Sequence, residues 1–192
     1  MTLPPAEGSG RQRGGRVRVY LAATPAVLAE AVRTGSLPAS LPVHAVTPSL
    51  REWYTEGDTE ELELAALLDA GLSSLRVLAA EEGSGTPRRV VLAADVPDGA
   101  ARSAPPAPDD DARSAVHLTA PVALSQVVSA HVDEAEAEAD VRAAMAALAE
   151  ADAGDEDAQF LVDGADGHDL LWYDATELAD LAGELAGGPG RG

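Results

Sequence analysis

Two residue types are missing from this sequence, and their absence excludes several kinds of enzyme. There is no Cys, which excludes thiol nucleophiles, disulfide bonds and Cys-bound zinc. There is also no Lys, because all 13 basic residues are Arg. A phosphate-binding loop of the Gly-x-x-x-x-Gly-Lys type and a pyridoxal phosphate enzyme both need a Lys. The chain also lacks a Gly-x-Ser-x-Gly motif and a Gly-x-Gly-x-x-Gly after its first predicted strand, so no cofactor is expected.

Aromatic residues are scarce at 3% of the chain, so the core must be built mostly from Ala, Val and Leu. A length of 192 residues suits one domain, which at that size needs no disulfide or metal for stability. The many Ala, Gly and Asp residues beside an all-Arg set of bases are typical of a GC-rich genome.

Negative charge dominates, with 33 acidic residues against 13 basic ones and a net charge of -20. Such a surface repels phosphate backbones and anionic lipids, so nucleic acid and membrane are excluded as partners. The expected partner is an unidentified protein or small molecule, and a basic protein or a cation is electrostatically allowed. The acidic surface also has a simpler interpretation, which is that it keeps the protein soluble.

Composition predicts one domain over residues 16–186, with a disordered segment before it and a tail after it. A stretch with four Pro and three consecutive Asp reads as a flexible linker within this domain. The segments are the disordered residues 1–15, the halves 16–94 and 114–186, the linker 95–113 and the tail 187–192.

Alternating or aliphatic runs predict seven strands, at residues 16–21, 42–46, 90–94, 115–118, 127–132, 158–162 and 169–173. Helices should lie between and after them. Their expected start signals are Thr24 and Thr47, each followed by Pro, and the acidic pairs Asp58 with Glu61, Asp133 with Glu136 and Asp174 with Glu177. Gly35 should end the first helix.

Strands that alternate with helices predict an α/β or α+β fold. We expect a mixed, partly parallel sheet of about six to seven strands covered by helices. Residues 19–28 resemble residues 116–124 with one residue deleted, which suggests two similar βαβαβ halves. Chance similarity in a chain rich in Ala and Val is the competing explanation.

The candidate catalytic residues are His131, Asp133, Asp157 and His168. His131 and Asp133 stand two apart on a predicted strand, so their side chains should share a face and could hold one ion. Asp133 as a helix cap explains the same pattern. The acidic residues 152–157 do not match a calcium loop, so no metal is expected. His168 could act as a base near neutral pH.

Four aromatic residues form a candidate ligand-binding set: Trp53, Tyr54, Trp172 and Tyr173. The two pairs could line one pocket. The alternative is that the Trp side chains belong to the core and the Tyr side chains face water at the rim of the sheet.

Several blocks resemble an uncharacterised bacterial family, a domain of unknown function: residues 17–24, 44–54, 131–133 and 168–173. The resemblance covers roughly residues 16–182, implies a cytoplasmic protein from a GC-rich bacterium, and supplies no activity. Because the sequence has a well-patterned fold but no assembled catalytic motif, we expect a non-catalytic cytoplasmic binding or regulatory domain. The alternative is a hydrolase-like or metal-assisted enzyme with a His/Asp site. Homodimerisation through an exposed strand edge is a further possibility.

Overall fold

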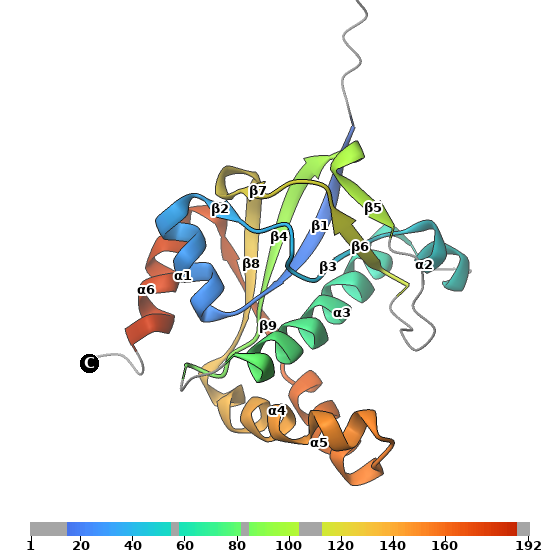
Figure 1. Ribbon diagram of the computed structural model, residues 1–192, viewed down its shortest axis with the longest axis vertical. Helices are drawn as coiled ribbons and strands as arrows, with labels where there is room; N and C mark the ends of the chain where they lie inside the picture. The colour runs from blue at the N-terminus through green and yellow to red at the C-terminus, as the bar shows by residue number, and fades with distance from the viewer. Residues whose placement is uncertain (1–14, 55–57, 82–84, 104–112, 188–192) are drawn as a thin grey trace, which may run out of the picture.

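A computed structural model of the protein describes residues 15–54, 58–81, 85–103 and 113–187 (Figure 1). Within these residues the chain forms an α+β fold. The strands are β1 (Arg16–Ala23), β2 (Ser36–Leu37), β3 (Val43–Ala45), β4 (Val90–Pro97), β5 (Ala101–Ser103), β6 (Ala115–Leu118), β7 (Val122–Ala123), β8 (Val127–Asp133) and β9 (Leu170–Asp174). The helices are α1 (Pro25–Thr34), α2 (Pro48–Trp53), α3 (Thr59–Ala80), α4 (Glu138–Asp152), α5 (Glu156–Asp166) and α6 (Leu178–Gly187). Short 3-10 turns are η1 (Asp98–Ala100), η2 (Leu124–Gln126), η3 (Ala135–Ala137) and η4 (Ala175–Glu177).

Seven of the strands form one sheet in the order β5-β6-β3-β1-β4-β8-β9, and β2 pairs with β7 beside it. Every strand pair in the described residues is antiparallel. The expectation of a partly parallel sheet was therefore wrong, although the expected number of strands is correct for the main sheet.

The path of the chain explains why helical connections did not give parallel neighbours. Helix α3 joins β3 and β4, which do run in the same direction, but β1 lies between them and opposes both. Helices α4 and α5 pack against each other as a hairpin, so the chain re-enters the sheet at the end from which β8 left it. Strand β9 therefore runs antiparallel to β8.

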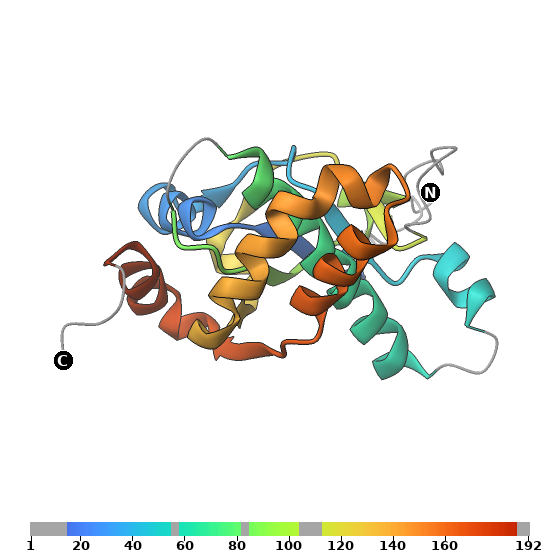
Figure 2. The ribbon, with the colours of Figure 1, turned by 90° about the horizontal axis from the view of Figure 1, so that it is seen from below.

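Alternate residues of the central strands face two separate cores. Val19 and Leu92 point to one face of the sheet, where they pack with residues of α1 and α6. These two helices lie side by side in Figure 1. Tyr20 and Val91 point to the other face, where they pack with α3. The α4–α5 hairpin packs against the C-terminal half of α3, where Leu75 lies in the core that they share. Figure 2 shows the hairpin over α3 from below.

Residues 158–162, expected as a strand, belong to helix α5. Asp155 begins the helix by accepting a hydrogen bond from the backbone N–H of Ala158. Ala158, Val162 and Ala165 are buried with helical spacing, whereas Phe160 is exposed. The short apolar run was thus one side of a helix, and of the last two expected strands, 158–162 and 169–173, only the second is present, as β9.

Most of the expected helix start signals are confirmed. Thr24 and Thr47 each accept a hydrogen bond at the start of their helix, and Gly35 ends α1 with a φ of 75°. Asp58 with Glu61, and Asp174 with Glu177, form capping boxes. Asp133 with Glu136 was the wrong pair, because the Asp133 side chain binds Arg89 instead.

The segment expected to be a linker is partly ordered in the sheet. Strand β4 continues to Pro97, and η1 and β5 follow it as far as Ser103. Residues 104–112, like most of the expected disordered start 1–15 and the last five residues of the tail, lie outside the described residues. The two halves share one sheet, since β6 pairs with β3 and β8 pairs with β4. No helix in the described ranges is long and apolar enough to span a bilayer.

Candidate functional site

Arg89, the residue before β4, is the centre of a densely hydrogen-bonded group of charged side chains. Only 3% of its side chain is exposed, and the Asp133 side chain at the end of β8 is completely buried. The guanidinium donates to both carboxylate oxygens of Asp133, at 2.9 Å from one terminal nitrogen and 3.1 and 3.2 Å from Nε. The backbone N–H of Arg89 donates to the same carboxylate at 2.6 Å. Asp133 is therefore saturated with hydrogen bonds from Arg89.

The rest of the Arg89 guanidinium binds the end of helix α5. One terminal nitrogen donates to Asp166 Oδ1 at 2.6 Å, and the other donates to the carbonyl oxygen of Ala165 at 2.6 Å. The Asp166 side chain remains 45% exposed, so this second ion pair is more strongly screened by water. Arg89 thus fastens β8 and α5 to the start of β4.

His168 lies beside this cluster, in the loop between α5 and β9. Its carbonyl oxygen accepts a hydrogen bond of 3.4 Å from Arg89. Its ring faces two acids, with Nε2 at 2.8 Å from Asp140 and Nδ1 at 3.5 Å from Glu134. The hydrogen bond to Asp140 is the main reason why the pKa of His168 is raised above its ordinary value.

The other two candidate catalytic residues are not joined to this group by any described contact. His131 is half-buried on β8 and its Nε2 lies 3.3 Å from Ser129 Oγ. Burial, followed by the nearby charge of Arg18, lowers the pKa of His131. Asp157 is exposed in the first turn of α5. Across the ranges that the structure describes, no three His, Asp or Glu side chains are placed to hold a metal ion.

A second polar cluster, which sequence reasoning missed, connects α3 to β3 and the residue before β6. His44 Nδ1 lies 2.8 Å from Ser114 Oγ, and His44 Nε2 lies 2.8 Å from Ser73 Oγ. The Ser114 hydroxyl donates its proton to Asp69. Ser114 must therefore accept from His44, so Nδ1 carries a proton, and in the neutral imidazole Nε2 accepts from Ser73.

The hydrogen bonds therefore run from Ser73 to His44, from His44 to Ser114, and from Ser114 to Asp69. A series of this kind could act as a proton relay. However, His44 is only 3% exposed and Ser114 is completely buried, so substrate could reach the relay only at its two half-buried ends, Ser73 and Asp69. Every buried side-chain nitrogen or oxygen among the described residues has a hydrogen-bond partner. The relay therefore also satisfies the polar groups that fasten α3 to the sheet.

A family model for a family of unknown function, DUF6912, matches residues 17–182. The chain belongs to DUF6912. The resemblance of the sequence blocks to a domain of unknown function is therefore confirmed. No curated protein and no solved structure matches the chain. The DUF6912 match spans both polar clusters and β9, so each is part of the family domain.

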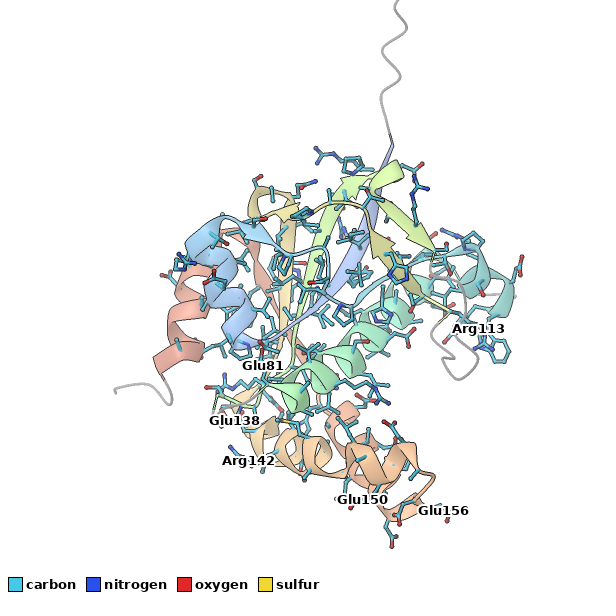
Figure 3. All side chains as sticks on the ribbon, viewed as in Figure 1. Glu81, Arg113, Glu138, Arg142, Glu150 and Glu156 are labelled. Carbon is cyan, nitrogen blue, oxygen red and sulfur yellow. The ribbon has the colours of Figure 1, made fainter. Side chains whose placement is uncertain are left out.

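The candidate aromatic residues of this DUF6912 domain lie in two separate places. Trp53 and Tyr54 are exposed at the end of α2, which follows β3. The Arg113 guanidinium stacks on the Trp53 ring at 3.9 Å from the ring centroid, and Figure 3 shows Arg113 beside α2. Trp172 and Tyr173 are on β9, and the strands β1, β4 and β8 separate them from β3. The two pairs do not line one site.

The exposed fractions distinguish the members of the second pair. Trp172 is 61% exposed, and its neighbour Leu171 is 43% exposed. Tyr173 is half-buried against the core that contains α1 and α6. Trp172, expected either in a pocket wall or in the core, is instead a surface residue of the last strand in the sheet.

Proposed function

We propose that this protein is a non-catalytic cytoplasmic binding domain whose partner is a protein segment of positive charge. The observation that carries the proposal is the contrast between the two kinds of candidate residue. Asp133, the best candidate for chemistry, is buried and saturated by Arg89. Trp172, a candidate for binding, is 61% exposed on a sheet edge. Exposed aromatic side chains are typical anchors at protein interfaces.

Charge supports a basic partner. Residues 133–187 contain 17 acidic residues and a single base, Arg142. This part of the chain includes α4, α5, β9 and α6, so its negative charge surrounds the exposed Trp172 in sequence. A field of this sign attracts cationic segments and speeds their association at low ionic strength.

Selection from a random peptide library displayed on phage tests the proposal with the full chain as bait. We expect the enriched peptides to carry net positive charge, and we expect their affinity as synthetic peptides to fall as NaCl is added. The matched control is each peptide with its Arg and Lys replaced by Glu, which should not bind. Failure to enrich any peptide, or enrichment of neutral peptides whose affinity is independent of salt, would overturn the proposal.

The alternative function is a hydrolase in which Ser73 is the nucleophile and His44 its general base. The hydrogen-bonded series from Ser73 to Asp69 favours it, and the burial of His44 opposes it. A fluorophosphonate probe should label Ser73 in the native protein and not in His44→Gln if this reading is correct. Absence of labelling in the native protein removes it.

A further inference from the structure

Strand β9 is an edge of the main sheet. It pairs with β8 on one side, from Leu170 opposite Asp133 to Asp174 opposite Ser129, and no strand in the described part of the chain pairs with its other side. A strand in this position presents a row of backbone N–H and C=O groups to any extended segment that approaches it.

The side chains of β9 lack the features that usually protect an edge. Proteins commonly place charged residues, Pro or a bulge on an exposed edge strand. The sequence of β9 is Leu-Leu-Trp-Tyr-Asp, and its register with β8 is continuous, so it contains no Pro, no bulge and no charge before Asp174. Leu171 and Trp172 are both exposed. These apolar side chains could therefore contact a strand added alongside.

The charge around β9 identifies the occupant. Asp163 and Asp169 precede the strand, Asp174 ends it and Glu177 follows, with no Arg between residues 163 and 177. A second copy of this chain would bring its own net charge of -20 to the same edge, which opposes pairing between copies. An extended segment that contains Arg or Lys would meet charge of the opposite sign on both sides of Trp172.

We infer that β9 is a docking strand, to which a cationic extended segment of a partner protein adds as an eighth strand of the main sheet. This inference rests on the proposed function and names the mode of binding. Backbone hydrogen bonds along β9 would hold the segment, and Trp172 would contact an apolar side chain within it. The acids that flank β9 would select for basic residues near the ends of the segment.

The first test is amide hydrogen exchange measured by NMR on the full chain, with and without a basic peptide obtained by the phage selection. Strand addition would protect alternate amides of β9, those whose N–H groups point away from β8, because each would gain a hydrogen bond. Protection confined to another surface, or an unchanged β9, would overturn the inference while leaving the proposed binding function in place. Failure to obtain any peptide would instead remove the proposed function.

The second test uses two lysine variants with nearly the same exposure. Trp172→Lys should weaken peptide binding by about tenfold or more, because it removes the aromatic contact and places a positive charge on the edge. Trp53→Lys is the control, because Trp53 is 63% exposed on α2 and the substitution adds the same charge. Equal weakening by both variants would show that charge alone acts and would overturn the role of β9. Light scattering that shows a dimer in the native protein and a monomer in Trp172→Lys would assign the edge to a second copy instead.

Discussion

At the scale of single residues, the pair of Arg89 and Asp133 provides a direct test of how the two halves are held together. Both side chains are buried, so removal of the guanidinium leaves a buried carboxylate with no opposite charge. We expect Arg89→Met to lower the free energy of unfolding by about 3–5 kcal/mol. The double variant Arg89→Met, Asp133→Leu should recover much of this loss, because it removes both charges. Urea unfolding of the native protein, the two single variants Arg89→Met and Asp133→Leu, and the double variant measures the coupling between the two side chains.

The matched control for Arg89 is Arg76, whose ion pair with Asp152 is about half exposed on each side. Arg76→Met should cost less than about 1 kcal/mol, since water screens exposed pairs. Similar losses for Arg76→Met and Arg89→Met would contradict the view that burial makes Arg89 important.

Two histidines should titrate on opposite sides of the ordinary histidine pKa of about 6.5. The acids Asp140 and Glu134 raise the pKa of His168, whereas burial lowers the pKa of His131. His168 should therefore stabilise the fold at a pH below about 6.5, and this contribution is lost as pH rises through its folded pKa. The contribution of His131 to stability depends on pH in the opposite way. Burial lowers the pKa of His131 in the folded state, so the folded protein becomes less stable relative to the unfolded chain as pH falls below about 6.5.

NMR titration of the four His rings measures both pKa values directly. Asp140→Asn should lower the pKa of His168, because the Asp140 side chain is hydrogen-bonded to the His168 ring. The pKa of His131 should stay unchanged, because no described contact joins Asp140 to His131. Urea unfolding across the same pH range should show that Asp140→Asn destabilises the protein at low pH more than at high pH. A pKa of His168 at or below that of His131 would contradict the geometry around Asp140.

Sequence reasoning at this scale found residues but not their partners. Asp133 and His168 were selected as candidate residues, yet Arg89 was not, because nothing in the sequence next to Arg89 reveals that its partners lie at the end of β8 and of α5. His44 and Ser114 are separated by 70 positions, so their contact has no local signal. Long-range polar contacts depend on strand order, and the sequence did not specify that order.

At the scale of elements, two glycines should respond in opposite directions to replacement by Ala. Gly35 has a φ of 75°, in the left-handed region, where a Cβ is strained. Gly164 lies within helix α5, and a Cβ built there meets nothing within 4 Å. We expect Gly35→Ala to cost about 1 kcal/mol and Gly164→Ala to gain about 0.5–1 kcal/mol, as measured by thermal and urea unfolding. A gain at Gly35 would mean that α1 does not end as the structure describes.

Elements were predictable where a local signal was strong. The capping box of Asp58 and Glu61, and the Thr-Pro starts of α1 and α2, depend only on neighbouring residues and are confirmed. Helix α5 was missed because the run from Ala158 to Val162 is too short for periodicity alone to separate a strand from one side of a helix. Its Asp155 cap was the signal that could have identified it.

At the scale of the whole molecule, alternating strands and helices predicted a helix-covered sheet but not the direction of its strands. The α4–α5 hairpin reverses the chain once more than a single crossover helix does, which makes β9 antiparallel to β8. Predicting residues 158–162 as a strand removed the second helix of this hairpin, and with it the extra reversal, from the predicted topology. An error at one element therefore changed the predicted topology of the sheet.

The net charge of -20 gives the last prediction, which separates overall repulsion from local helix electrostatics. Glu150 is in the last turn of α4 and Glu156 in the first turn of α5, both exposed on the hairpin, as Figure 3 shows. Glu150→Arg and Glu156→Arg each reduce the net negative charge by the same amount, which should stabilise the protein at low ionic strength. The helix dipole favours Arg at the end of α4 and disfavours it at the start of α5.

We therefore expect Glu150→Arg to raise the free energy of unfolding by about 0.5–1 kcal/mol and Glu156→Arg to change it little, because in the second variant the two effects oppose each other. Urea unfolding at increasing NaCl should bring both variants towards the native value, since salt screens exposed charges. Equal stabilisation by both would mean that overall repulsion dominates and that the dipoles contribute little. A difference that persists in high salt would show that packing, and not charge, separates the two positions.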